Sequence, residues 1–222
     1  MLEGQSMKPG QPRNNIYFIL GEAAIYLLYF VWLWAVGNGL YGISGTLYVL
    51  FVVFSALIMV GIVYIDPALN GSLKQLLGSK DLMVLMATIV FLVLLLSYLG
   101  QDPYQLFQYY PVYFDEINFR FIIQRKQASL IGDGRAVIVQ SALYMLFYSS
   151  IIVFESPGYP FPYNYLFLLD MFSMGIIYGL FYYLRKNIYL SLSLHFSLLA
   201  ILDIAQFLPI STIWIPYTFS PL

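Results

Sequence analysis

Seven stretches of about 20 mostly apolar residues, the length that a helix needs to cross a bilayer, divide this chain of 222 residues. Of all residues 61% are hydrophobic and only 9% are charged, against about 25% charged residues in an average soluble domain. The sequence therefore predicts an all-α fold, a polytopic transmembrane helix bundle with about seven spanning helices. The expected spans are 16–36, 45–65, 82–99, 104–124, 136–154, 165–184 and 188–208. Turn signals separate them at Gly37-Asn38-Gly39, Asn70-Gly71, Asp102-Pro103, Gly132-Asp133-Gly134 and Ser156-Pro157-Gly158.

The basic residues fall into alternate connections between these spans. Nine of the ten Lys and Arg precede the first span or lie between spans two and three, four and five, or six and seven; the tenth, Arg120, is within a span. Cytoplasmic loops of membrane proteins concentrate Lys and Arg. We therefore expect a multi-pass integral membrane protein with its N-terminus in the cytoplasm and its C-terminus outside. Residues 1–15 would form a polar cytoplasmic tail, 16–208 the transmembrane domain and 209–222 an interfacial tail.

One short polar cluster, Asp115-Glu116-Ile117-Asn118-Phe119-Arg120, interrupts the fourth expected span. Ionisable residues at membrane depth are costly, usually face the protein interior and mark functional sites. Glu116 and Arg120 are four residues apart, so on a helix they share a face and can form an ion pair. Asp115 lies about 100° further round and is free for another role, such as taking up a proton. The residues alone leave a second interpretation equally open, in which a buried ion pair only fixes helix packing.

His195 is the single histidine, and it is expected in the middle of the seventh span with Ser191 one turn before it. A histidine at that depth is either functional or hydrogen-bonded to a neighbouring helix. One histidine cannot build a zinc site alone, although a mixed site with Asp115 and Glu116 is chemically allowed. The chain has no cysteine, which excludes disulfides and cysteine-based sites. Three further acids in spans are each more simply packing or near-interface groups, although together with the others they could form a proton relay: Glu22, Asp170 and Asp203.

The polar cluster, with Pro111 ahead of it, resembles the first motif of the CAAX protease and bacteriocin-processing (CPBP) family of polytopic intramembrane endopeptidases. The family pattern is a Pro, then two acids, three residues and an Arg, typically with a Phe before the Arg. Phe119 and Arg120 fit this pattern. The first acid is Asp115 rather than the usual Glu, and Phe121 stands where a Gly often follows.

Two later stretches are similar to this family in order and spacing, so that the resemblance covers about 108–199 within a CPBP-like core of about 104–208. The closing region, 172–195, has the spaced glycines Gly175 and Gly179, a short turn and the helix with its His. The Asn that often follows four residues later is Leu199. The intervening helix, 140–151, holds no second His, and its place is taken by Ser149, Ser150 or Ile151. Two candidates to substitute for it lie on the same helix, Tyr144 and Tyr148.

The resemblance implies an intramembrane endopeptidase that uses no metal or other cofactor. In this family the first acid and the histidines activate a water that attacks a peptide carbonyl, and a His/Asn pair stabilises the oxyanion. Carried over, Asp115 is the base, Glu116 and Arg120 are the structural pair with Asn118 in support, and His195 is the oxyanion or proton-transfer group. The expected partners are the lipid bilayer and a membrane-embedded or lipidated peptide; no basic patch points to nucleic acid.

Two alternatives stay open. Asp115 is one methylene shorter than Glu, a misplacement of about 1 Å can cost about 100-fold in rate, and the missing His removes a group worth typically about 10²–10⁴-fold. A catalytically inactive homologue that binds a membrane peptide or lipidated partner as a scaffold is therefore as well supported as an active protease. A small proton-coupled transporter is the third reading, and it is weakened because the two halves show no convincing repeat.

Overall fold

The protein is described by a computed structural model that covers residues 12–77, 80–100, 110–154 and 161–206. All regular structure in these residues is helical, as the sequence predicts. The elements in chain order are α1 (Pro12–Gly37), α2 (Tyr41–Ile65), α3 (Pro67–Leu77), α4 (Asp81–Tyr98), α6 (Tyr110–Phe114), η1 (Asp115–Gln124), α7 (Arg125–Ile131), α8 (Asp133–Phe154), α9 (Phe161–Arg185) and α10 (Ile188–Gln206). The interfacial tail expected at 209–222, most of the N-terminal tail, and the turns at 102–103 and 156–158 lie outside the described residues.

Five helices of the described residues are long and apolar enough to cross a membrane. They are Asn15–Gly37, Gly42–Ile65, Asp81–Tyr98, Asp133–Ile152 and Tyr165–Arg185, which match the first, second, third, fifth and sixth expected spans. The fourth expected span corresponds to α6 and η1, whose charged and amide side chains lower its hydropathy. The seventh corresponds to α10, of which Ile188–Leu198 is a shorter apolar helix. The multi-pass helical bundle is confirmed, whereas the count of seven spans stays a prediction.

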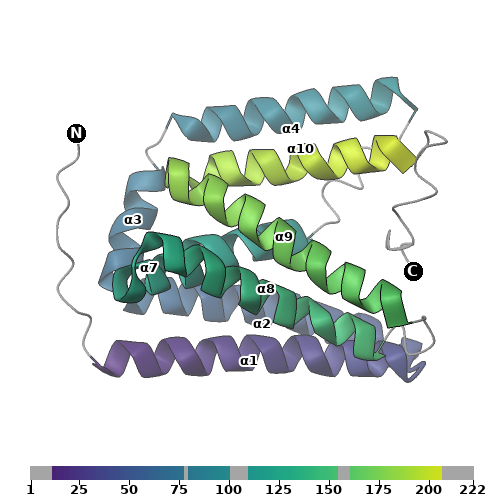
Figure 1. Cartoon of the computed structure of the whole chain (residues 1–222), viewed down its shortest axis with the longest axis horizontal. Helices are drawn as coiled ribbons and strands as arrows, with labels where there is room; N and C mark the ends of the chain where they lie inside the picture. Colours follow the sequence, from purple (N-terminus) through teal and green to yellow (C-terminus); the bar gives the residue numbers. More distant parts are fainter. Residues whose placement is uncertain (1–11, 78–79, 101–109, 155–160, 207–222) are drawn as a thin grey trace.

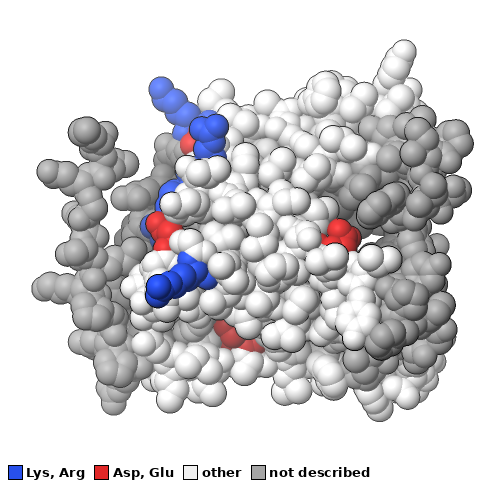
Figure 2. All heavy atoms as spheres, in the orientation of Figure 1, with Lys and Arg blue, Asp and Glu red and all other residues white. Residues whose placement is uncertain are grey.

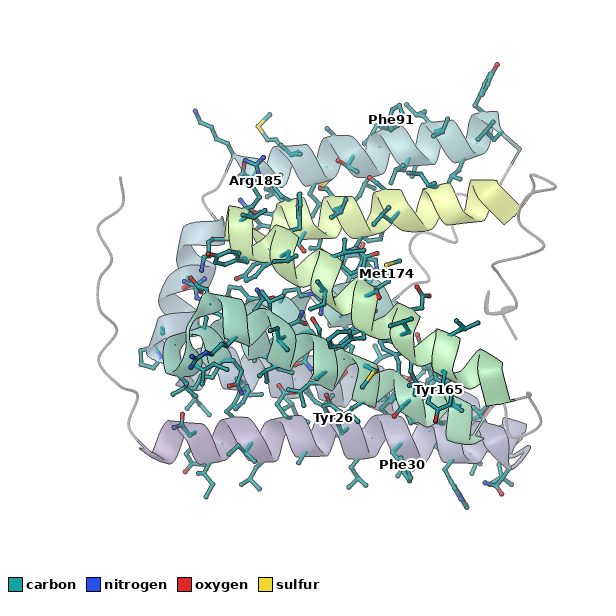
Figure 3. All side chains as sticks on the ribbon, viewed as in Figure 1. Tyr26, Phe30, Phe91, Tyr165, Met174 and Arg185 are labelled. Carbon is teal, nitrogen blue, oxygen red and sulfur yellow. The ribbon has the colours of Figure 1, made fainter. Side chains whose placement is uncertain are left out.

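The helices lie in pairs around η1 (Figure 1). α1 packs on α2 along one side, α4 packs on α10 along the opposite side, and α8 and α9 pack on each other between them. η1 contacts α2, α8, α9 and α10, so the polar cluster occupies the centre of the bundle. Figure 3 shows Phe30 on α1 and Phe91 on α4 pointing away from the bundle, as side chains that face lipid do.

The turn signals within the described residues have different outcomes. Asn38 caps α1 by donating from Nδ2 to Trp34 O at 2.8 Å, and Gly39 follows with φ of 69°. Gly132, with φ of 87°, separates α7 from α8. The turn expected at Asn70-Gly71 is wrong, because these residues lie within α3.

α3 has local sequence causes. Asp66 precedes the helix, and its Oδ1 accepts hydrogen bonds from Ala68 N at 3.0 Å and Leu69 N at 3.4 Å. Pro67 follows at the first helical position, where its missing N–H costs nothing. An Asp-Pro pair is thus a start signal for a helix, and it outweighs the weaker turn tendency of Asn70-Gly71.

Basic side chains gather at one end of the bundle, the end at which α1 begins (Figure 2). Two ion pairs tie connections together there. Lys126 Nζ lies 2.5 Å from Asp66 Oδ2, and Lys186 Nζ lies 2.6 Å from Asp133 Oδ1. The sorting of Lys and Arg in the sequence therefore corresponds to one end of the described structure.

We expect Gly175→Ala to destabilise the protein by about 1–3 kcal/mol, the usual cost of overpacking. Gly175 faces α8, and a Cβ there would lie 2.9 Å from Ser141 Cα, a backbone atom that cannot rotate away. The midpoint of thermal unfolding in detergent measures the effect. Gly61→Ala is the matched control, because a Cβ at Gly61 meets nothing within 4 Å and the change should stabilise α2 slightly. Equal midpoints for the two variants would contradict this packing.

Candidate active site

η1 is a π-helix that carries the polar cluster through the centre of the bundle. Nine of its residues are buried, among them Asp115, Glu116, Asn118 and Arg120. π-helical turns are rare and occur frequently at functional sites. The wider turn changes which side chains share a face, which is a feature that the α-helical spacing of the sequence does not predict.

Asp115 is bound by two tyrosine hydroxyls of α8. Tyr148 Oη lies 2.8 Å from Asp115 Oδ1 and 3.0 Å from Oδ2, and Tyr144 Oη lies 3.1 Å from Oδ2. The carboxyl group is 3% exposed. No ion pair joins Asp115 to a basic residue in the part of the chain that the structure describes.

Glu116 turns to α10 instead and is held on both oxygens. Ser191 Oγ donates to Oε2, and His195 Nδ1 lies 3.0 Å from Oε1. Arg120 Nε approaches the same Oε1 at 3.9 Å. The adjacent acids therefore have different partners, as the sequence predicts. Glu116 pairs with Arg120 and also bonds to α10.

Arg120 is fully buried and joins the two carboxylate networks. Its Nη1 donates to Gln140 Oε1 at 2.7 Å. Its Cζ lies 4.8 Å from the centre of the Tyr144 ring and 5.6 Å from that of Tyr178, so cation–π contacts flank the guanidinium. Tyr178 in turn stacks on His195 with the ring centres 4.2 Å apart.

Two buried amides complete the site, and the sequence analysis missed both. Gln140 Nε2 donates to Gly175 O at 2.7 Å and to Ser141 Oγ at 2.8 Å. Gln124 Nε2 donates to Gly179 O at 2.9 Å. The spaced glycines thus present their carbonyl groups to glutamines of neighbouring helices. A signal was present, since an amide within an apolar span is itself unusual, but it is weaker than a charge.

Asn118 extends the cluster toward α1. Its Nδ2 donates to Glu22 Oε2 at 3.0 Å, so one of the isolated in-span acids contacts the motif. Asp170 on α9 is exposed, and the side chain of Asp203 lies outside the described residues. The proton relay that included all of these acids stays a prediction.

Ser149 and Ser150 do not contact Asp115 in the structure. Ser149 Oγ donates to Leu146 O at 2.7 Å and Ser150 Oγ to Phe147 O at 2.6 Å, both within α8. The face of α8 that contacts Asp115 carries Tyr144 and Tyr148 instead.

The described Asp, Glu and His side chains form no group of three or more that is arranged to hold a metal ion. The mixed site allowed by the sequence for His195, Asp115 and Glu116 is therefore not assembled among these residues. Their recorded contacts are with hydroxyl groups, a guanidinium and one another.

The comparison with protein families gives a match to the type II CAAX prenyl endopeptidase Rce1-like family over residues 89–201. This match covers half of the chain. The chain belongs to the Rce1-like family. The match confirms the CPBP resemblance, and it begins in α4, before the region in which the motifs were found. No curated protein and no solved structure matches the chain significantly.

The Rce1-like match covers η1, α8 and α9 completely and ends within α10, so it includes the elements that hold Asp115, Glu116, Arg120 and His195. α1 and α2, with Glu22, lie before it. Membership implies a membrane environment and peptide substrates in general.

Proposed function

We propose that this Rce1-like chain is an intramembrane endopeptidase in which Asp115 activates the attacking water without a metal. The observation that carries the proposal is that the adjacent acids Asp115 and Glu116 have different binding partners. Glu116 is tied to Arg120, Ser191 and His195, whereas Asp115 accepts hydrogen bonds from two tyrosine hydroxyls and forms no ion pair among the described residues. A carboxylate that forms no direct ion pair in a desolvated site is a better proton acceptor than one that does.

In the proposed reaction, Asp115 takes a proton from water as the water oxygen bonds to the peptide carbonyl carbon. Tyr148, whose hydroxyl lies within reach of both Asp115 oxygens, donates to the developing oxyanion, a role that tyrosine hydroxyls can fill. The C–N bond then breaks and the leaving amine takes up a proton. Glu116 holds His195 through Nδ1, which leaves Nε2 free to accept the proton that Asp115 took from water and to pass it to the leaving amine, so that Asp115 returns to its carboxylate form. The substrate is a membrane-embedded or lipidated peptide.

One observation favours a second candidate, a catalytically inactive homologue that binds such a peptide as a scaffold. Both oxygens of Asp115 already accept hydrogen bonds from tyrosine hydroxyls, and the carboxyl group is 3% exposed. Neither part of a surface cavity along α1 is lined by Asp115, Glu116 or His195. Hydrolysis thus needs an opening that admits water to Asp115.

The test is cleavage of a broad library of membrane peptides by the purified full chain, with and without a chelator. The proposal expects new peptide termini whose yield does not change with the chelator. Loss of cleavage in chelator would assign the chemistry to a metal ion. Cross-linking of intact peptides with no new termini would favour the scaffold role.

We further propose seven spans, with the N-terminus and the end of the bundle that carries Lys80 facing the cytoplasm. Because the chain has no cysteine, single-cysteine variants report sidedness cleanly. Lys80 and Tyr98 lie at opposite ends of α4, and both are exposed. A membrane-impermeant maleimide applied to intact cells should label Tyr98→Cys, and it should label Lys80→Cys only after permeabilisation. The reverse pattern would invert the proposed orientation.

A further inference from the structure

A groove runs along α1 on the outer surface of the bundle. Its deeper part is a cavity of about 140 Å³, and an adjoining part of about 160 Å³ extends toward the beginning of α1. The two parts share Phe18, Ile19 and Gln127, so we treat them as one feature, the α1 groove. The deeper part is lined by mostly apolar side chains of α1, η1 and α8, together with Gln127 of α7 and Glu22 of α1. Figure 3 shows Tyr26, which also lines it, between α1 and α8.

Glu22 enters this groove with an unsatisfied carboxylate oxygen. The residue is 9% exposed, its Oε2 accepts from Asn118 Nδ2, and its Oε1 has no hydrogen-bond partner. Asn118 Oδ1 is likewise buried and without a partner. Buried polar atoms are nearly always hydrogen-bonded, and two neighbouring acceptors without a donor indicate that a donor from outside is missing.

The described residues around the groove do not supply that donor. The Tyr26 hydroxyl donates to Leu143 O at 3.1 Å. Lys126 lines the outer part of the groove, but its Nζ lies 2.5 Å from Asp66 Oδ2. No ion pair to Glu22 is formed in the part of the chain that the structure describes.

The depth of Glu22 limits what the donor can be. The apolar span of α1 begins at Asn15, so Glu22 lies seven residues, or about 10 Å, along the helix from that point. A lipid headgroup at the membrane surface does not reach this depth. A cation at this depth has to be carried on an apolar body of its own, as a basic residue is on a transmembrane helix.

We propose that the α1 groove binds a transmembrane helix of a partner protein that carries a Lys or Arg, which pairs with Glu22. The groove has a suitable shape, because its α1 wall is one helical stripe that runs along the membrane-crossing direction: Asn15, Phe18, Ile19, Glu22 and Tyr26. Glu22 is the one acidic residue in the sequence of α1. The pairing is independent of hydrolysis at Asp115, so it goes beyond the proposed function.

The test uses the full chain in phosphatidylcholine liposomes, labelled at Lys80→Cys, and synthetic transmembrane peptides of Leu and Ala. One peptide carries a single Lys about 10 Å below its cytoplasmic end, and the matched peptide carries Leu there. Energy transfer between chain and peptide measures association. The Lys peptide should associate at least about threefold more tightly than the Leu peptide, the lower end for a polar contact between helices in a membrane. Glu22→Gln, nearly identical in shape, should remove this preference.

Two further variants show whether a lost preference comes from the removed charge or from misfolding. Asp170→Asn alters another acid of a spanning helix, one that does not line the groove, and should leave the preference intact. Glu22→Lys should reverse it, so that a peptide with Glu at the same depth associates most tightly. Equal association of the Lys and Leu peptides with the wild type, or a preference retained by Glu22→Gln, would overturn the proposal. So would loss of the preference when phosphatidylethanolamine is added, because the groove would then hold a lipid ammonium group.

Discussion

Replacing Asp115 with asparagine is expected to reduce kcat/KM for a cleaved membrane peptide by about 10²–10⁴-fold, the usual contribution of a general base. Asparagine has the shape of aspartate but cannot take a proton from water. The Asn side chain can still accept a hydrogen bond from Tyr148 or Tyr144, so the site should keep its shape and still bind the peptide. The loss should therefore appear in kcat. Initial rates over a range of peptide concentrations, with the chain in detergent or liposomes, separate the two constants.

Ser149→Ala is the matched control for this variant. Ser149 lies on α8 beside Tyr148, but its hydroxyl bonds only the backbone of its own helix. Its rate should stay within about twofold of the wild type, since local Ser bonds to the helix contribute little. If Asp115→Asn cleaves as fast as Ser149→Ala, with both folded alike, Asp115 is not the base.

Replacing Arg120 with methionine is expected to destabilise the protein by about 3–5 kcal/mol, the cost of breaking a buried ion pair by removing one partner. The guanidinium is completely buried. Its loss leaves Gln140 Oε1 without its donor and weakens the charge compensation of Glu116. The cation–π contacts with the Tyr144 and Tyr178 rings are lost as well. Thermal unfolding in detergent, compared with that of the wild type, measures the effect.

Two variants show whether this cost is specific. Arg135→Met removes an exposed arginine near the beginning of α8 and should change stability by less than about 0.5 kcal/mol. Arg120→Lys keeps the charge but not the planar fork, and should recover only part of the loss. Comparable unfolding midpoints for Arg120→Met and Arg135→Met would show that the buried pair does not hold η1 in place.

The sequence predicted the helices correctly where a single feature, such as a long apolar run, determined the local structure. Long apolar runs predicted α1, α2, α4, α8 and α9, and Gly132 marked the end of a helix at a residue with positive φ. α3 was missed because the loop reading rested on Asn70-Gly71, whereas the capping Asp66 and Pro67 determine the local structure. The polar segment expected as the fourth span is helical over Tyr110–Gln124, whereas its crossing of the membrane stays a prediction. Its π-helical form was not predictable, because it depends on buried contacts with several helices.

The charged residues of the site could be predicted from the sequence, whereas its neutral polar residues could not. The sequence separated Asp115 from Glu116 and paired Glu116 with Arg120 from their α-helical spacing, and these two residues still approach each other in the π-helix, with Arg120 Nε 3.9 Å from Glu116 Oε1. It left Tyr144 and Tyr148 as alternative substitutes for the missing His, because the rotation of α8 about its axis is set by packing between helices. Gln140 was missed for the same reason, as its role comes from the carbonyl of Gly175 on α9. Glu22 could not be linked to Asn118 because 96 residues separate them.

The central claim is that water activated at Asp115 attacks a peptide bond. Digestion of a cleaved library peptide in H₂¹⁸O, with chelator present and followed by mass spectrometry, tests it most directly. The claim predicts one ¹⁸O atom in the new C-terminal carboxylate of the product from the wild-type chain, and unlabelled intact peptide from Asp115→Asn. A labelled product formed equally by both chains, or a peptide that the wild type binds but leaves intact, would contradict it.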